Sequence, residues 1–253
     1  MVLVPFVFSC SPLTVMRIFG INPVLEAVRA KRATLIRVSP RADDRLTQLV
    51  RLAEEQGVAV QRVSADELDR LAGGARHQGV VGDVAEAGSY SVEDLVIGAK
   101  AASLIVVLDG IEDPHNVGAI LRTVDAAGGD GVVRQSRHAA RLDGAAAAAS
   151  AGAVAHVKIA EVVNIARAIE LLKDAGVWTV GLAGDAGKRY DEVDLTVPTA
   201  IVVGAEATGL RRLVRERCDW LVSIPMAGHV QSLNVSVATG IALFEAVRQR
   251  TGK

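Results

Sequence analysis

Three polar segments interrupt the apolar runs of this chain, and each carries side chains that can bind a ligand. In the first segment, Asn116 and Arg122 follow the acidic loop 109–113. An asparagine in the first turn of a helix can hold a ligand hydroxyl beside backbone N–H groups that have no helical partner. An arginine six residues later points about 120° away around the helix. Arg122 therefore either binds an anion away from Asn116 or pairs with a local carboxylate, Asp125 or Glu112.

The second segment is a glycine-rich loop after an apolar strand. Gly204 and Gly209 enclose it, and glycine lets a backbone approach a ligand closely. Glu206 lies at the apex of the loop, where its carboxylate either serves the ligand or holds an N–H group of the turn.

The third segment joins a strand that ends at Ile224 to an apolar helix. It contains the polar pattern Ser232, Leu233, Asn234. Ser232 is a candidate N-cap for the helix. Asn234 then needs another reason to stand before a helix of this kind, and ligand binding is one.

Several other chemistries have no counterpart in the sequence. No GxGxxG follows a predicted strand, and no GxSxG, HExxH or DFG is present. Loop 204–209 has the glycine spacing of a phosphate-binding loop, but Leu210 and Arg211 replace the lysine and the hydroxyl residue. The histidines show no metal-ligand spacing, so no metal is expected. Cys10 and Cys218 suit neither a disulfide framework nor a zinc site, which favours a reducing compartment, the cytoplasm.

Alternating strands and helices must position the three segments. Apolar strands are predicted over 104–108, 131–133, 177–182, 200–203 and 221–224, and helices over 113–127, 145–149, 164–174, 210–217 and 236–249. Continuous apolar strands are typical of a mostly parallel sheet covered on both faces. Ligands bind at the carboxyl ends of such strands. All three segments follow a strand, so this edge is the expected site. The alanine run 145–149 is interpreted as a packing helix.

A smaller α/β unit precedes this domain. Its predicted elements are a helix with Asn22 as N-cap and Pro23 as first residue, strands 35–38, 58–63 and 80–84, and helices over 46–56 and from Ser64. The predicted division is an extension 1–15, a domain 16–88, a linker 89–102 and a domain 103–253. The extension is too short for a membrane span and lacks a basic start, so it is either a disordered or docking segment or lies upstream of a natural start at Met16.

Composition limits the partners. The 253 residues are 50% hydrophobic and 23% charged, which excludes wholesale disorder. The formal net charge of −1 argues against a dedicated nucleic-acid binder. The basic excess is local, since residues 16–82 hold 11 Lys and Arg against 8 Asp and Glu. Aromatic residues make up only 3% of the chain and leave few side chains for stacking on unpaired bases.

Together the three segments resemble motifs 1, 2 and 3 of the SpoU branch of the SPOUT RNA methyltransferases, the TrmH family. The resemblance covers 103–250 and rests on Asn116 with Arg122, on Gly204, Glu206 and Gly209, and on Ile224-Pro225-Met226 followed by Ser232-Leu233-Asn234. Stretches 20–27 and 76–79 resemble the substrate-binding domain of this family, which is L30e-like. The C-terminal helix is most similar to members that methylate the ribose 2′-hydroxyl of a guanosine in 23S rRNA.

The resemblance implies a fold and partners. It implies an α/β chain whose catalytic domain has a deep C-terminal trefoil knot, a rare exception among folds. It implies S-adenosyl-L-methionine as cofactor, contacted by Gly204, Ile224 and Leu233, and RNA as substrate, with no membrane partner. It also implies a homodimer through the C-terminal domain that completes the site. The implied RNA contacts from the N-terminal domain, each of which is otherwise a solvated charge, are Arg29, Lys31, Arg32, Arg41 and Arg76.

The implied catalytic residues divide the work. Asn116 and Asn234 orient the ribose, Glu206 holds the loops, and Ser232 completes the set. The motif 1 arginine is regarded in the family as the base, but a guanidinium normally keeps its proton in proteins. Arg122 is therefore expected to bind the 3′-phosphate through two hydrogen bonds and to stabilise the developing alkoxide, while the phosphate or a water accepts the proton.

Two departures and three alternatives remain open. Ala207 stands where the family usually has glycine, and 134–151 is richer in alanine than the family, so a basic RNA contact is absent there. The alternatives are a tRNA 2′-O-ribose methyltransferase, an antibiotic-resistance methyltransferase and a non-catalytic RNA-binding paralogue. The polar residues kept in all three motifs argue against the last.

Overall fold

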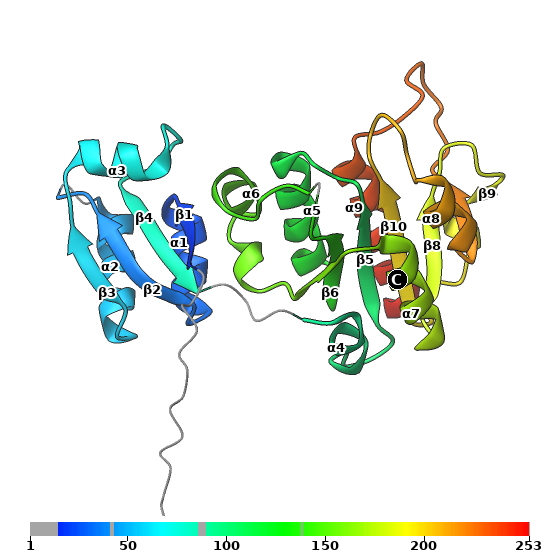
Figure 1. Ribbon diagram of the computed structural model, residues 1–253, viewed down its shortest axis with the longest axis horizontal. Helices are drawn as coiled ribbons and strands as arrows, with labels where there is room; N and C mark the ends of the chain where they lie inside the picture. Colours follow the sequence, from blue (N-terminus) through cyan, green and yellow to red (C-terminus); the bar gives the residue numbers. More distant parts are fainter. Residues whose placement is uncertain (1–14, 41–42, 86–89, 138, 253) are drawn as a thin grey trace, which may run out of the picture.

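The chain forms two α/β units, each built on its own sheet (Figure 1). The computed structural model describes residues 15–40, 43–85, 90–137 and 139–252. The extension predicted over 1–15 therefore lies outside the described residues except for Val15. Within the described residues, no helix combines the length and the apolarity needed to cross a membrane.

The N-terminal unit is a four-stranded sheet with three helices. The strand order is β1-β4-β2-β3. The strands are β1 (Val15–Phe19), β2 (Ala33–Val38), β3 (Ala59–Arg62) and β4 (Val80–Ala85), and the helices are α1 (Ile21–Arg29), α2 (Asp44–Glu55) and α3 (Ala65–Ala72). Strand β4 is antiparallel to both β1 and β2, whereas β2 and β3 are parallel. Strand β1 was not predicted from the sequence.

The start of α1 differs from the prediction. The helix begins at Ile21, and its N-cap is Gly20 with φ of 97°, so the prediction of Asn22 as cap was wrong. The reason is a distant partner, because the Ile21 N–H donates to Oε1 of Gln78 at 3.0 Å. The predicted Ser64 cap is confirmed: its hydroxyl accepts from the Glu67 N–H at 3.3 Å.

The larger unit is a seven-stranded sheet in which every neighbouring pair is parallel. The order is β7-β6-β5-β10-β8-β11-β9. The strands are β5 (Leu104–Asp109), β6 (Gly131–Gln135), β7 (Ile159–Val162), β8 (Trp178–Leu182), β9 (Lys188–Arg189), β10 (Thr199–Gly204) and β11 (Trp220–Ser223). The predicted fold class, α/β with a mostly parallel sheet, is confirmed, although β7 and β9 were not predicted.

Helices cover both faces of this sheet. They are α4 (Val92–Ile97), α5 (Pro114–Ala126), α6 (Gly144–Ala149), α7 (Ile165–Asp174), α8 (Arg212–Arg217) and α9 (Val235–Thr251). Alternate residues of β5 point to opposite cores: Leu104, Val106 and Leu108 pack with α5 and α9, whereas Ile105 and Val107 pack with α4, α7 and α8. The segment 89–102, predicted as a linker, thus carries a helix that packs on the core of the larger unit.

The alanine-rich helix α6 lies between the two units, which agrees with the interpretation of 145–149 as a packing helix. A Cβ on Gly118 of α5 would lie 2.5 Å from the Ala146 carbonyl oxygen, so α5 and α6 are in close contact. A Cβ on Gly152 would lie 2.5 Å from Cβ of Glu26 in α1. Glu26 also pairs with His156 at 3.0 Å. Small side chains therefore let the N-terminal unit pack directly on the larger unit.

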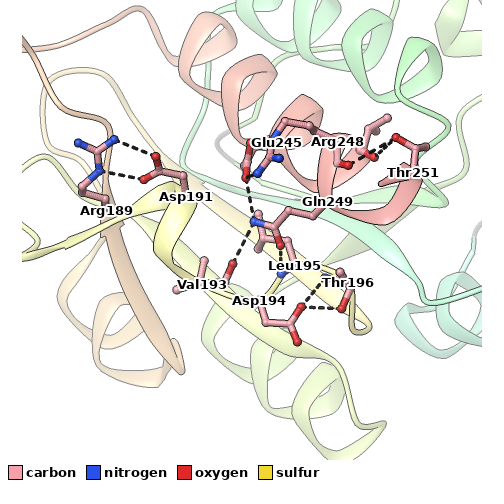
Figure 2. Close-up of polar contacts among 11 residues, drawn as sticks. Arg189, Asp191, Val193, Asp194, Leu195, Thr196, Glu245, Arg248, Gln249 and Thr251 are labelled. Carbon is pink, nitrogen blue, oxygen red and sulfur yellow. Dashed lines mark hydrogen bonds and ion pairs between the residues drawn. The ribbon is translucent and has the colours of Figure 1, made fainter. Parts of the chain in front are cut away.

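The last turns of α9 fasten the segment that precedes β10 (Figure 2). The Gln249 amide donates to the Val193 carbonyl at 3.1 Å and accepts from the Leu195 N–H at 2.8 Å. Buried Glu245 accepts from Arg248 and Gln249, and the hydrogen bond from Arg248 lowers its pKa. The end of α9 is thereby fixed relative to the strands that carry the polar loops.

Candidate active site

A cavity of about 410 Å³ opens at the carboxyl end of the parallel sheet, after β8, β10 and β11. Its lining includes Gly204, Ile224 and Leu233, the residues predicted to contact a cofactor. Other lining residues are Leu182, Gly184, Asp185, Thr208, Met226, Gln231, Ser232 and Ala238. The volume lies within the range of roughly 300–1,000 Å³ that is usual for small-molecule sites.

The loop after β10 closes tightly over this cavity. The Gly209 N–H donates to the Ala205 carbonyl at 2.7 Å. A Cβ on Gly204 would lie 2.2 Å from the carbonyl carbon of Gly209, so no other residue fits there without movement of the backbone. Ala207 is not among the residues with positive φ, whereas Gly209 has φ of 65°. Ala207, which stands where the family usually has glycine, therefore causes no backbone strain.

Three predicted catalytic side chains meet in one hydrogen-bonded cluster at this edge. The Asn234 amide nitrogen donates to Oδ1 of Asn116 at 2.8 Å and to Oε1 of Glu206 at 2.6 Å. Asn116 is buried in the first turn of α5, as predicted, and Glu206 lies exposed at the apex of its loop. The cluster thus joins the starts of α5 and α9 to the loop after β10.

Asn234, and not Ser232, caps helix α9. The Asn234 Oδ1 accepts from the Ser236 N–H at 3.0 Å and from the Ser236 hydroxyl at 2.5 Å, so the interpretation of Ser232 as N-cap was wrong. The side-chain oxygen of Asn234 therefore caps α9, while its amide nitrogen donates to Asn116 and Glu206. Ser232 is exposed, lines the cavity and has no hydrogen bond to the described residues.

The structure does not bring Arg122 to this cluster. Arg122 is exposed on α5, and among the described residues no hydrogen bond or ion pair involves its guanidinium, so pairing with Asp125 or Glu112 is not observed. It lines a separate cavity of about 420 Å³ between α1 and α5, together with Arg29. The rotation of about 120° expected from the helical spacing accounts for this separation.

Two charged residues that line the cavity after β8, β10 and β11 were not predicted, Asp185 and Arg215. Asp185 follows β8, and Arg215 of α8 donates to its two oxygens at 2.8 and 3.0 Å. The hydrogen bond from Arg215 holds the pKa of Asp185 below its ordinary value. An ionised carboxylate therefore faces the opening. The rule that located the other segments, a polar residue just after a parallel strand, applies to Asp185 as well.

The basic residues predicted to contact RNA differ in their exposure to solvent and in the partners that their side chains already have. Arg29, Lys31 and Arg76 are exposed, and Arg29 pairs with Glu26 at 2.8 Å. The Arg32 guanidinium instead donates to the carbonyls of Val154 and Ala85 at 3.0 Å each, and so links the two units. Arg41 lies outside the described residues.

The amide groups and the carboxylate of the cluster can orient a hydroxyl group of a ligand. Within the described parts of the chain, no group of three or more His, Cys, Asp or Glu side chains is placed to hold a metal ion. The site is thus a preformed cavity beside a cluster of neutral amides and one carboxylate.

Replacement of Asn234 by alanine is expected to lower the free energy of unfolding by about 1–2 kcal/mol, since α9 loses its cap and Glu206 loses a donor. Urea denaturation measures this change. Ser232→Ala is the matched control, and a change within about 0.5 kcal/mol is expected because Ser232 has no hydrogen bond to the described residues. Equal losses in the two variants would contradict the assignment of the cap.

Comparisons with known proteins show the family of this chain. Residues 103–244 match the SpoU rRNA methylase family, and residues 17–89 match the RNA 2′-O ribose methyltransferase substrate-binding domain. The 23S rRNA (guanosine-2′-O-)-methyltransferase RlmB of Photobacterium profundum is 45% identical over 238 residues, 92% of this chain and 97% of that protein. RlmB of Escherichia coli (strain K12) is 42% identical over 239 residues, 92% and 98% of the two chains.

One of the similar solved structures contains a bound cofactor. The AdoMet-bound rRNA methyltransferase from Sinorhizobium meliloti has a TM-score of 0.78 and 26% sequence identity, and the match covers 92% of this chain and 87% of that one. The similarity therefore spans both units of the chain.

Proposed function

The chain belongs to the SpoU rRNA methylase family, and we propose that it transfers the methyl group of S-adenosyl-L-methionine to the ribose 2′-hydroxyl of a guanosine in 23S rRNA. The observation that carries this conclusion is the 45% identity to an RlmB protein along 97% of its length, so that both the substrate-binding and the methylase regions are matched. The Asn116–Glu206–Asn234 cluster supplies the polar groups that the reaction needs.

The residues of the cavity fit S-adenosylmethionine. Gly204 lets the loop backbone pack closely at the cavity wall, and Ile224 and Leu233 provide an apolar wall. Asp185 and Arg215, which pair with each other, line the same cavity and offer polar groups to the polar parts of this ligand. When bound, the cofactor supplies an electrophilic methyl group on a sulfonium.

The protein's own residues then position the ribose. Asn116 holds a sugar hydroxyl through its amide nitrogen, which has no hydrogen bond among the described residues. Asn234 orients Asn116 by donating to its Oδ1 at 2.8 Å, and Glu206 fixes the Asn234 amide by accepting its hydrogen bond at 2.6 Å. Ser232, on the cavity wall, completes the set. Correct positioning can lower a reaction barrier by roughly 7–11 kcal/mol, which makes the rigidity of the cluster its main contribution.

Arg122 acts on the phosphate beside the target ribose. Its guanidinium is exposed, so it can bind the phosphate through two hydrogen bonds and stabilise negative charge on the 2′-oxygen. The proton passes to the phosphate or to a water.

A homodimer explains how Arg122 reaches a site from which it is separated in one chain. Val237 and Phe244, seven residues apart on α9, are each 50% exposed. Apolar side chains at this spacing share one helix face, and such a face suits a second copy of the chain. In this dimer the Arg122 of one protomer serves the cluster of its partner.

The fold and the location of the protein follow from the same proposal. A deep trefoil knot formed by the C-terminal region is what the match of residues 103–244 to the SpoU rRNA methylase family implies. Because the proposed substrate is ribosomal RNA, we expect the protein to act in the cytoplasm, where ribosomes are assembled. The divisions at 16–88 and 103–253 remain the proposed domain boundaries.

Binding of RNA is expected to weaken as salt rises, because phosphate contacts release counterions. Replacing Arg29, Lys31 and Arg76 together with glutamine should reduce the slope of log Kd against log salt by about 3, about one for each lost phosphate contact. The same titration of Arg51→Gln, whose side chain pairs with Glu55 on the surface of α2, should leave the slope unchanged. Equal slopes for the wild type and the triple variant would exclude this surface.

Methyl transfer from labelled S-adenosylmethionine tests the function. Unmodified large-subunit rRNA and unmodified tRNA are offered in parallel, and the methylated position is mapped. Label at one guanosine of 23S rRNA is the expected result. Label in tRNA alone would keep the chemistry and overturn the substrate. Cofactor binding without transfer to rRNA, to ribosomal particles or to tRNA would favour a non-catalytic RNA-binding protein.

A further inference from the structure

A carboxylate is buried at the carboxyl end of β5. Asp109 is the last residue of this strand, and its side chain has 0% exposed surface. Among the described residues, only Arg211 pairs with it: the Arg211 backbone N–H donates to Oδ2 at 2.8 Å, and Nε donates to Oδ1 at 2.6 Å. An ionised carboxylate is costly to bury unless it is paired and hydrogen-bonded. Arg211 therefore compensates the burial of Asp109.

This pair fastens the loop that closes over the cavity. At the entry of the loop, Gly204 lies opposite Asp109 in the register of β10 and β5. At the exit, Arg211 returns to the same Asp109. Between these points the loop closes on itself through the 2.7 Å hydrogen bond from Gly209 to Ala205. Both ends of the loop are thus held at one residue of β5.

From this geometry we infer that Asp109 and Arg211 are positioning residues for the methyl transfer. The pair keeps the loop closed, so that Gly204 stays on the cavity wall and Glu206 stays within 2.6 Å of Asn234. Arg211 itself is half-exposed, and its charge is not buried with that of Asp109. The inference rests on the proposed function, since the cavity must hold the cofactor for the position of the loop to matter.

A purely stabilising pair would behave differently. Buried ion pairs are weak stabilisers, and apolar replacements are often neutral. A structural role would change the free energy of unfolding and leave the KM for S-adenosylmethionine of the folded protein as it was. A positioning role raises the KM and Kd for S-adenosylmethionine and leaves the KM for RNA unchanged.

The test compares Arg211→Lys and Arg211→Gln with wild type in the full chain. Calorimetry gives the Kd for S-adenosylmethionine, and methyl transfer gives both KM values. Arg211→Lys is expected to raise the Kd about tenfold, because an ammonium group keeps the charge and lacks the planar fork of the guanidinium. Arg211→Gln is expected to raise it further. Arg212→Gln is the matched control, since Arg212 pairs with Glu216 on the surface at 2.9 Å, and its Kd should equal that of wild type.

A folded Arg211→Lys protein with the wild-type Kd and KM for S-adenosylmethionine would overturn the inference. This variant keeps the charge beside Asp109 and decides the question even where Arg211→Gln does not fold. A wild-type chain that binds no S-adenosylmethionine would instead overturn the proposed function, and the positioning role with it.

Discussion

Replacing Arg122 with alanine is expected to lower kcat for methyl transfer by about 10²–10³-fold, the usual cost of removing one group that stabilises a developing oxyanion. The Kd for S-adenosylmethionine should stay at its wild-type value, because Arg122 lines a different cavity from Gly204 and Leu233. Single-turnover methyl transfer and calorimetry measure the two quantities. A loss of cofactor binding in this variant would contradict the assigned role.

The lysine variant tests whether Arg122 acts through its positive charge alone or through two hydrogen bonds to the phosphate. Lysine keeps the positive charge and loses the two parallel N–H groups that bind a phosphate. Arg122→Lys should therefore retain less than about a tenth of the wild-type kcat, in line with the loss of a charge-assisted hydrogen bond. Near-normal turnover with lysine would exclude binding of the phosphate through two hydrogen bonds.

Mixed dimers test whether Arg122 acts across the interface of the proposed homodimer. A mixture of Arg122→Ala chains and Asn234→Ala chains forms heterodimers in which one site has both intact residues if Arg122 comes from the partner. Activity should then exceed that of either variant alone. No recovery in verified heterodimers would place Arg122 and Asn234 of the same chain in one site.

Replacing Gly204 with alanine is the second change with a large expected effect. The new Cβ would lie 2.2 Å from the carbonyl carbon of Gly209 and 2.3 Å from its oxygen, and both atoms belong to the backbone. The loop must open to relieve this contact, and a displacement of about 1 Å can cost on the order of 10²-fold in rate. We expect a loss of this size in kcat/KM for S-adenosylmethionine, together with about 1–3 kcal/mol of stability.

Gly187→Ala is the control for this prediction. A Cβ at Gly187 meets nothing within 4 Å, and this glycine does not have positive φ. Its affinity and stability should equal those of wild type. Wild-type affinity in Gly204→Ala would show that the loop moves without consequence, and would remove Gly204 from the cofactor site.

Local signals located the polar loops correctly. The strand ends located the loops, the family resemblance then implied Gly204, Ile224 and Leu233 as cofactor contacts, and the structure places all three on one cavity. The rule works because parallel strands bring their carboxyl ends to one edge of a sheet. The same rule explains why Asp185, which follows β8, belongs to this cavity.

Local signals misplaced residues whose partners lie far away in the chain. Ser232 has the residue type of an N-cap, but Asn234 takes that position because Glu206, 28 residues away, also holds it. The start of α1 depends on Gln78, 57 residues away. The RNA contact of Arg32, which the family resemblance implied, stays a prediction, and its guanidinium donates to the Val154 carbonyl, 122 residues distant.

The sequence by itself determined the alternation of strands and helices, the parallel sheet and the residue types of the three loops, because periodicity, caps and glycine act over a few neighbours. Only the tertiary structure decided which of these side chains meet. Asn116 and Asn234 are 118 residues apart, and Asp109 and Arg211 are 102 apart. The order β5-β10-β8-β11 brings them together, and that order depends on the packing of the whole domain. The same packing turns Arg122 away from the cluster, since its helix is fixed by the apolar face that it buries.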